Sequence, residues 1–373
     1  MGIPEKIRSI QDEIEKTQIN KATEHHVGLL KAKIARLKRE LEENTHAKTL
    51  STGSRNAGFD IRKTGDATVV FVGLPSVGKS TLLNRLTNAK SRVGSYNFTT
   101  LSAVPGILDH RGAKIQVLDM PGIIEGASKG KGLGKKVLSV ARNADLVLLI
   151  LDVFQPQHLA ILSRELSDIG IKLDQKPPDV LIERTSTGGV SVNIQVQTRI
   201  TEALVKEISR IYGIHNGRIT IREPGLTDEQ FIDVLIGNRV YIPSLVVLNK
   251  IDLVNQGFVR EVQAKIGDKF IPISADVNIN IDALKDAIYK KLDFIRIYMR
   301  PKGGETDYKE PMIMRRGCTI QDVCSKIHRS MIRDFRFSYI WGKSAKFGGQ
   351  KVGLDHMLID EDVLTIIKKT SAP

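Results

Sequence analysis

The chain has 373 residues, a length that predicts two or three domains. It carries 56 Lys and Arg against 42 Asp and Glu, a formal charge of +14, and its 41% of hydrophobic residues excludes wholesale disorder. No apolar run approaches the roughly 18 residues that span a bilayer, and the N-terminus leads into mixed charges rather than an apolar secretory core. Cys318 and Cys324, the two cysteines, lack a metal-ligand spacing, which fits a reducing compartment. We therefore expect a cytoplasmic protein with no membrane contact.

The N-terminal segment predicts helices. Isoleucines and leucines recur at three- and four-residue spacing over 5–44, and Asn20, Thr23 and Gly28 interrupt the pattern between two runs. We expect a helical hairpin packed on its own protein rather than a dimer zipper, and hence a monomer. The Gly- and Ser-rich residues 49–65 are expected to form a connecting loop.

The middle of the chain alternates strands with helices. Short apolar, β-branched runs predict strands at 67–72, 114–118, 146–153, 244–248 and 270–273. Helical stretches fall between them at 79–88, 133–142, 157–169 and 280–294. This alternation predicts an α/β fold, with a mainly parallel sheet covered by helices on both faces.

The interval from 170 to 242 is too long for one crossover helix. Two short runs, 180–184 and 190–195, flank Thr187-Gly188-Gly189 and predict a β-hairpin. A helix at 201–212, a strand at 218–221 and a helix at 228–236 are expected to follow. We therefore predict a small α+β domain inserted within the larger one.

The pattern changes again after residue 294. Strands are expected at 312–314, 337–341 and 363–367, together with a helix over 319–333. Thr319 and Asp322 have the spacing of a capping box at the start of that helix. A ββαββ-like unit of about 75 residues is a plausible separate domain.

A phosphate-binding motif directly follows the first strand. Residues 73–80, Gly-Leu-Pro-Ser-Val-Gly-Lys-Ser, match G-x-x-x-x-G-K-[ST] between a strand and a helix, which is the context that the motif requires. The glycines allow backbone N–H groups to point at phosphate oxygens. Lys79 would lie between the β- and γ-phosphates, the Ser80 hydroxyl would bind Mg²⁺, and the following helix N-terminus favours negative charge.

An aspartate ends the strand that follows. Asp119-Met-Pro-Gly122 places a carboxylate at the sheet edge of the phosphate loop, where it can hold Mg²⁺ through water or directly. Gly122 can offer its backbone N–H to a γ-phosphate and move away after hydrolysis.

A base-recognition motif follows a later strand. In Asn249-Lys250-Ile251-Asp252, the Asp252 carboxylate can accept hydrogen bonds from guanine N1–H and the exocyclic amine, a donor pair that adenine lacks. Asn249 and Lys250 are expected to brace this loop and cover the base. Ser274-Ala275, after the last strand, fits a backbone contact to the guanine oxygen.

These ordered motifs resemble those of translation-factor-type GTPases of the Obg branch. Phe98-Thr99-Thr100-Leu101 is similar to that branch's first switch, and Asp119 to Gly126 with the following glycines to its second. Nearly the whole chain resembles the developmentally regulated GTP-binding (DRG) family. That resemblance implies an N-terminal helical domain at 1–48, a GTPase domain at 66–169 and 243–294, a ribosomal-protein-like insert at 170–242, and a TGS domain with a β-grasp fold at 295–373.

The motifs and the resemblance together give a set of expected site residues. Residues expected to act in catalysis are Lys79, Thr100 (preferred to Thr99) and Gly122, and those expected to hold Mg²⁺ are Ser80, Thr100 and Asp119. The expected GTP-binding residues are Gly73, Ser76, Val77, Gly78, Lys79, Ser80, Thr81, Asp119, Gly122, Asn249, Lys250, Asp252, Ser274 and Ala275.

Hydrolysis is expected to be slow without help. Ile123 stands where a water-orienting glutamine is expected, and an aliphatic side chain cannot orient water by hydrogen bonding. Turnover would then need a regulatory protein partner, a cation or another residue; Glu125 is a weak candidate because acids prefer exposure. K⁺ is a candidate cation, but Ser76 stands where related potassium-activated enzymes often have asparagine.

Charge and aromatic residues point to a nucleic-acid partner. Residues 295–373 carry 15 basic and 9 acidic side chains, and Phe335, Phe337, Tyr339 and Trp341 lie among them, as stacking on RNA would require. The resemblance implies association with ribosomes. We expect a GTPase switch that contacts the ribosome or ribosomal RNA. The alternatives are a ribosome-assembly GTPase of Obg type and an RNA-binding scaffold with little nucleotide turnover.

Overall fold

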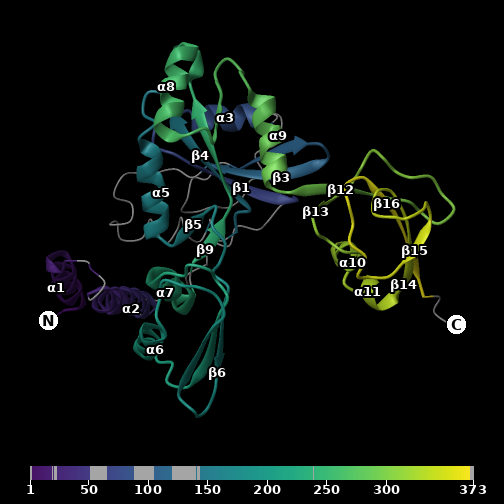
Figure 1. Cartoon of the computed structure of the whole chain (residues 1–373). Coiled ribbons are helices and arrows are strands. Elements are labelled where there is room, and N and C mark those ends of the chain that lie inside the picture. The colour runs from purple at the N-terminus through teal and green to yellow at the C-terminus, as the bar shows by residue number, and fades with distance from the viewer. Residues whose placement is uncertain are drawn as a thin grey trace. The chain divides into compact units, whose positions relative to one another are not determined.

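The structure is a computed structural model that describes residues 2–18, 20, 23–50, 65–87, 105–119, 140, 143–237 and 239–369. The chain divides into two compact units, one of Met1–Gly58 with Gln175–Tyr241 and one of Phe59–Asp174 with Ile242–Pro373 (Figure 1). Among the helices of the described ranges, none is both long and apolar enough to cross a membrane.

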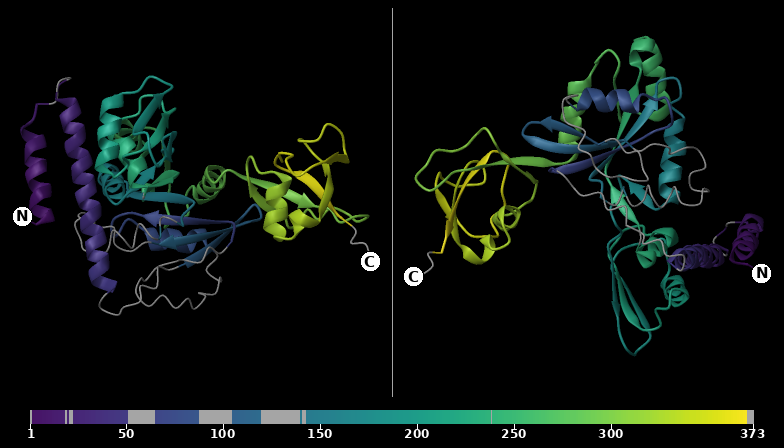
Figure 2. Two further views of the ribbon diagram at one scale, coloured as in Figure 1. Left: turned by 90° about the horizontal axis from the view of Figure 1, so that it is seen from below. Right: turned by 180° about the vertical axis from the view of Figure 1, so that it is seen from behind.

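The first unit begins with the expected helical hairpin. Helix α1 (Ile3–Lys16) lies beside α2 (Glu24–Leu50), as Figure 2 shows. Gly28, which was expected to interrupt the helices, instead lies inside α2. A Cβ at Gly28 would be 3.0 Å from Leu204 Cδ2, so the glycine permits α2 to pack closely against Leu204 of the inserted domain.

The inserted domain differs from the predicted hairpin. Its sheet has the order β6 (Val180–Arg184), β8 (Gly217–Ile221), β7 (Val190–Ile194), with β6 antiparallel and β7 parallel to the central strand. The predicted β6–β7 pairing is therefore wrong. Ile219 and Ile221 are fully buried, so β8 takes the middle of the sheet. Helices α6 (Glu202–Ile211) and α7 (Asp228–Ile236) cover its apolar side together with α2.

The second unit contains the predicted, mainly parallel sheet. Its order is β11 (Phe270–Pro272), β10 (Ser244–Asn249), β4 (Leu146–Asp152), β1 (Ala67–Val72), β3 (Ala113–Asp119) and β2 (Pro105–His110). Only β2, which the sequence did not predict, runs antiparallel to its neighbour. All five predicted strands are confirmed.

Helices cover both faces of this sheet, as predicted. Helices α3 (Lys79–Leu86) and α9 (Ile281–Lys291) pack on one face, and α5 (His158–Asp168) lies on the other (Figure 1). Helix α8 (Gln256–Ile266) was not predicted. Of the helix expected at 133–142, only Val140 belongs to the described residues, and it is helical.

This topology brings several loops to one edge. The segments after β1, β3, β10 and β11 all leave the carboxyl ends of parallel strands, which is where open α/β sheets bind ligands. The sheet is closely packed beneath these loops, since Val69, Phe71, Ile115 and Leu148 are fully buried in one hydrophobic cluster. The chain also forms two short strands, β5 (Ile171–Leu173) and β9 (Val240–Ile242).

The C-terminal part forms a five-stranded mixed sheet with the expected β-grasp arrangement. Its order is β13 (Met312–Arg315), β12 (Phe294–Met299), β16 (Asp362–Lys368), β14 (Phe335–Trp341) and β15 (Gln350–Val352). Strands β12 and β15 were not predicted, so the ββαββ description was incomplete.

The helix predicted at 319–333 is two helices, α10 (Ile320–Ile327) and α11 (Met331–Asp334). His328 between them is extended, at φ −166° and ψ 142°. The buried stripe of α10 is Ile320, Val323 and Cys324, whereas Ile327 is 38% exposed, so nothing in the core requires the helix to continue.

Candidate functional site

The loop between β1 and α3 has a backbone that glycine makes possible. Ser76 and Gly78 have φ of +66° and +91°, so the chain turns twice through the left-handed region within three residues. A Cβ at Gly78 would lie 2.4 Å from Asn249 Nδ2, and one at Gly73 would lie 2.6 Å from the Ile150 carbonyl oxygen. Both motif glycines are therefore sterically required.

Lys79 lies over this loop. Its Nζ donates hydrogen bonds to the carbonyl oxygens of Gly73 and Leu74, each at 2.9 Å. Burial lowers the pKa of Lys79, and the negative charge of Asp119 opposes that shift only partly. A partly desolvated cation at the N-terminus of α3 attracts phosphate more strongly than a solvated surface lysine does.

Two oxygen-bearing side chains meet beside the loop. Ser80 Oγ donates to Asp119 Oδ2 at 3.2 Å. The other carboxylate oxygen, Asp119 Oδ1, is buried and has no hydrogen-bond partner among the residues that the structure describes. A hydroxyl and an unsatisfied carboxylate oxygen fit a hard divalent cation such as Mg²⁺, which prefers oxygen ligands.

Asn249 joins the phosphate loop to the loop after β11. Its side chain is almost fully buried. Nδ2 donates to the Val77 carbonyl at 2.8 Å, and Oδ1 accepts from the Ala275 backbone N–H at 3.0 Å. One amide thus holds two predicted site segments in fixed positions, which agrees with the bracing role expected of Asn249.

Lys250 is fixed by a residue that the sequence analysis missed. Its backbone is left-handed at φ +68°, and its Nζ contacts Asp152 Oδ2 at 2.7 Å. Asp152 is the register partner of Asn249 in the sheet, and its Oδ1 accepts from the Phe154 N–H at 3.0 Å. The sequence signal that could have identified Asp152 is its position as a carboxylate at the end of a predicted strand. Asp252 lies exposed in the short helix Ile251–Leu253 that follows.

A second missed residue, Arg85, holds the loop after β11 from the other side. Its Nε donates to the Ala275 carbonyl at 3.0 Å and its Nη2 to the Asp276 carbonyl at 2.6 Å. Ser274 is fully buried, and its backbone pairs in both directions with Ile279. This loop is therefore anchored to α3, to Asn249 and to its own turn.

The structure thus brings most of the expected residues to one sheet edge. Thr81 lies exposed in the first turn of α3. Thr100 and Gly122, and with them Thr99, Ile123 and Glu125, fall outside the described residues.

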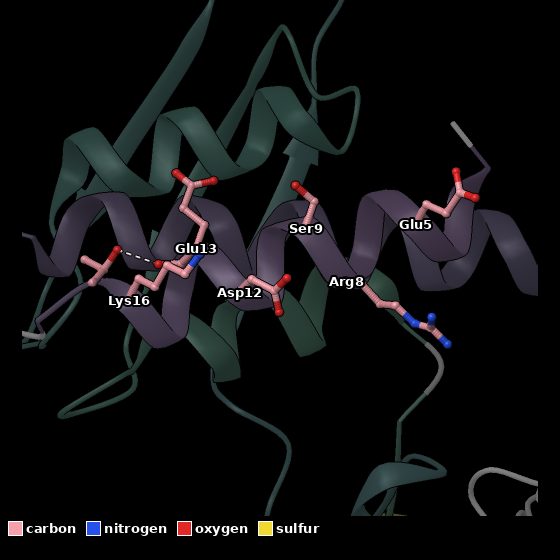
Figure 3. Close-up of a pocket in the computed structure, with 7 residues that line it drawn as sticks. Glu5, Arg8, Ser9, Asp12, Glu13 and Lys16 are labelled. Carbon is pink, nitrogen blue, oxygen red and sulfur yellow. Dashed lines mark hydrogen bonds between the residues drawn. The ribbon is translucent and has the colours of Figure 1, made fainter.

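A hollow in the first unit lacks the features of a phosphate-binding site. It lies along the polar side of α1, as Figure 3 shows, and is lined by Glu5, Arg8, Ser9, Asp12, Glu13, Lys16 and Thr17. Its lining residues include no glycine, and their three carboxylates outnumber their two cations. Its chemistry does not favour phosphate.

Models of three known families match consecutive parts of the chain. Residues 68–184 match the 50S ribosome-binding GTPase family, residues 187–294 match the C-terminal region of that domain, and residues 295–368 match the TGS domain. Among solved structures, the Schizosaccharomyces pombe YchF GTPase aligns with a TM-score of 0.46 at 14% identity, over 82% of this chain and 99% of that one.

Relatives match over the full length. An uncharacterised GTP-binding protein of Methanocaldococcus jannaschii is 53% identical, over 99% of this chain and 94% of its own. Developmentally-regulated GTP-binding protein 1 of Xenopus laevis is 45% identical, and the Dictyostelium discoideum homologue of that protein is 44% identical; each alignment covers 99% of this chain and 100% of the relative. The chain therefore belongs to the developmentally regulated GTP-binding (DRG) family, and it is a P-loop GTPase with a C-terminal TGS domain.

Proposed function

We propose that residues 73–80, Asp119, 249–252 and 274–275 form the GTP site of this enzyme, and that GTP hydrolysis there drives a switch that acts on ribosomes. The observation that carries the site assignment is the Asn249 amide, which contacts both the phosphate loop and the loop after β11. A single buried side chain that spans two loops is well suited to a ligand with a phosphate end and a base end.

The phosphate end is recognised by charge and backbone. Phosphoryl transfer depends on positioning and on neutralising the charge of the γ-phosphate, so Lys79 and the N–H groups of the phosphate loop carry the main burden. Ser80 and Asp119 would hold Mg²⁺, together with Thr100 as the family resemblance implies, and the ion would neutralise charge on the β- and γ-phosphate oxygens. The unsatisfied Asp119 Oδ1 supports this assignment.

The base end is recognised by Asp252. Its exposed carboxylate would accept hydrogen bonds from guanine N1–H and the exocyclic amine. Lys250, held by Asp152, fixes the backbone that precedes it. ATP would leave these groups unmatched, which costs several orders of magnitude in affinity.

Slow intrinsic turnover belongs to the same proposal. Ile123 offers no hydrogen bond to an attacking water, so we expect Ile123→Gln to leave GTP affinity nearly intact. A regulatory protein, K⁺ near Ser76 or a ribosomal group would then raise the rate. Phosphate release measured with K⁺ replaced by Na⁺, and with ribosomes added, separates these sources.

A ribosomal role is supported by charge and by the match of residues 68–184 to the 50S ribosome-binding GTPase family. The net charge is +14, and the 295–373 segment carries 15 basic against 9 acidic residues. Such an excess attracts RNA phosphates. We assign the helical domain at 1–48 and the domain at 295–373 to such partners, because the insert at 170–242 has equal numbers of basic and acidic residues.

Two experiments test the proposal. Calorimetry with GTP and ATP, with and without Mg²⁺, should show tight binding of GTP alone in wild type and its loss in Lys79→Ala. Lys302→Ala, in an exposed loop, is the matched control. Unchanged GTP affinity in Lys79→Ala would refute the site. Co-sedimentation with ribosomes under a GTP analogue, GDP or no nucleotide should favour the analogue; equal sedimentation in all three would refute the switch.

A further inference from the structure

Strand β14 presents a row of aromatic rings on the side of its sheet that faces away from the core. Ser338 and Ile340 point inward and are fully buried. Phe337, Tyr339 and Trp341, which we call the aromatic strip, alternate with them and point outward, and Tyr339 is 37% exposed. The ring centroids of Phe337 and Tyr339 are 5.2 Å apart, and those of Tyr339 and Trp341 are 6.3 Å apart.

The helices of this domain do not use the strip. Ile320, Val323 and Cys324 of α10 pack with Ile340 and Leu364 in the core on the inner side of the sheet. None of the three strip residues belongs to that core cluster. The Trp341 ring packs against Gly348 and Gly349, whereas the folding of the domain does not explain Tyr339 at the centre of the strip, which remains in contact with water.

Three cations flank the strip, one of them Arg336, whose Cζ lies 5.8 Å from the centroid of the Phe337 ring. Lys351 Nζ lies 4.1 Å from the centroid of the Phe337 ring, and Arg300 Cζ lies 4.9 Å from that of Trp341. Tyr339 has two cross-strand neighbours, Lys351 on β15 and Thr365 on β16. The central tyrosine thus has a cation beside it and no cation over its own ring among the described contacts.

In the part of the chain that the structure describes, no acidic side chain forms an ion pair with these cations. Within the described residues, neither Arg300 nor Lys351 has a carboxylate within salt-bridge distance. Arg296, further along β12, behaves differently, because it pairs with Asp360 and Glu361, each at 2.8 Å. Positive charge is therefore open beside the strip and compensated at Arg296. This arrangement is complementary to a partner that carries both flat rings and negative charge.

We propose that the aromatic strip binds single-stranded RNA, with bases stacking on Tyr339 and its neighbours and phosphates contacting Lys351 and Arg300. The inference rests on the proposed RNA role and specifies its surface and its partner. Unpaired bases offer free faces to aromatic rings, whereas bases of a duplex are stacked on each other. Lys351 favours this partner over a protein partner, because lysine is depleted in the cores of protein–protein interfaces.

Fluorescence anisotropy of the full chain with a labelled oligouridylate of about a dozen nucleotides tests the proposal. Tyr339→Ala should weaken binding about 5- to 150-fold, and Tyr339→Phe should restore most of it because the ring remains. Ile327→Ala is the matched control, since Ile327 is 38% exposed on α10 at the inner side. Lys351→Gln should reduce the slope of log affinity against log salt by about 0.7, whereas Arg329→Gln, between α10 and α11, should not.

Each outcome bears on the strip separately from the GTP site. An RNA duplex that binds wild type as tightly as the single strand would overturn the proposal. So would an affinity that Tyr339→Ala leaves unchanged, and the strip would then be assigned to a protein partner. GTP hydrolysis should be unchanged in Tyr339→Ala. If wild type hydrolyses GTP and sediments with ribosomes but does not bind the oligouridylate, the strip proposal fails while the proposed function stands.

Discussion

Asn249 offers the sharpest test of how the site is held together. Asn249→Ala removes a donor to the Val77 carbonyl and an acceptor for the Ala275 N–H, both in a buried environment. A hydrogen bond contributes about 1 kcal/mol net, and leaving its buried partner unpaired raises the loss to about 1–3 kcal/mol. For the two bonds we expect a total loss of about 2–4 kcal/mol, since water can reach some of the groups released.

That loss divides between folding and binding. Part appears as a lower free energy of unfolding without nucleotide, and the rest as weaker GTP binding, because the ligand must then order both loops. Urea unfolding and calorimetry together measure the sum. Asn255→Ala is the matched control: Asn255 caps α8 with one exposed hydrogen bond to the Phe258 N–H, and it should cost about 1 kcal/mol without changing GTP affinity. A summed loss for Asn249→Ala no larger than that of the control would refute the bracing role.

Three further substitutions probe single groups. Asp252→Asn should reduce GTP affinity by several orders of magnitude and allow xanthosine triphosphate to bind, because an amide can donate to the xanthine oxygen; nucleotide competition measures both. Lys79→Met should abolish GTP binding yet raise the free energy of unfolding without nucleotide. Burial lowers the pKa of Lys79 in the folded state below its value in the unfolded state. Between these two pKa values the unfolded state binds more protons, so the contribution of Lys79 to the free energy of unfolding should rise with pH. The Lys79→Met variant has no such group and should lack this rise. Burial alone would raise the pKa of Asp174, but hydrogen bonds from Lys291 and Ser244 outweigh it and lower that pKa. Asp174→Asn should therefore destabilise the protein at neutral pH, and the difference from wild type in chemical unfolding should vanish as pH falls through the folded-state pKa.

Much of the site follows from sequence because its residues stand directly after strands. The apolar run before Gly73 and that before Asn249 each predict a parallel strand, and the carboxyl ends of such strands meet at one edge. The local sequence then determines the backbone of the phosphate loop, since Gly78 adopts φ +91° and only glycine does so without strain. Residue type and position along the chain suffice for this part.

Other features depend on pairings that no local pattern encodes. The hairpin predicted around 187–189 is wrong because β8, over 20 residues later, lies between β6 and β7 and fully buries Ile219 and Ile221. Arg85 holds the Ala275 carbonyl across 190 positions of the chain, and a surface arginine on a helix gives no sign of such a partner. The break at His328 was missed because Ile327 continues the spacing of the apolar stripe, although its side chain is 38% exposed and lies outside the core cluster.

The base end of the proposed site would recognise what GTP and GDP share. Asn249 and Asp152 are register partners in adjacent parallel strands, so the segment that carries Lys250 and Asp252 is positioned by the sheet itself. A site fixed in this way has little freedom to respond to the γ-phosphate. In this proposal, discrimination between the two nucleotides would lie at the phosphate end, in Lys79 and in Thr100 and Gly122, to which the family resemblance gives contacts with the γ-phosphate. Loss of the Asn249 contacts should accordingly weaken GTP and GDP binding by the same factor, because the base end does not report the phosphate count.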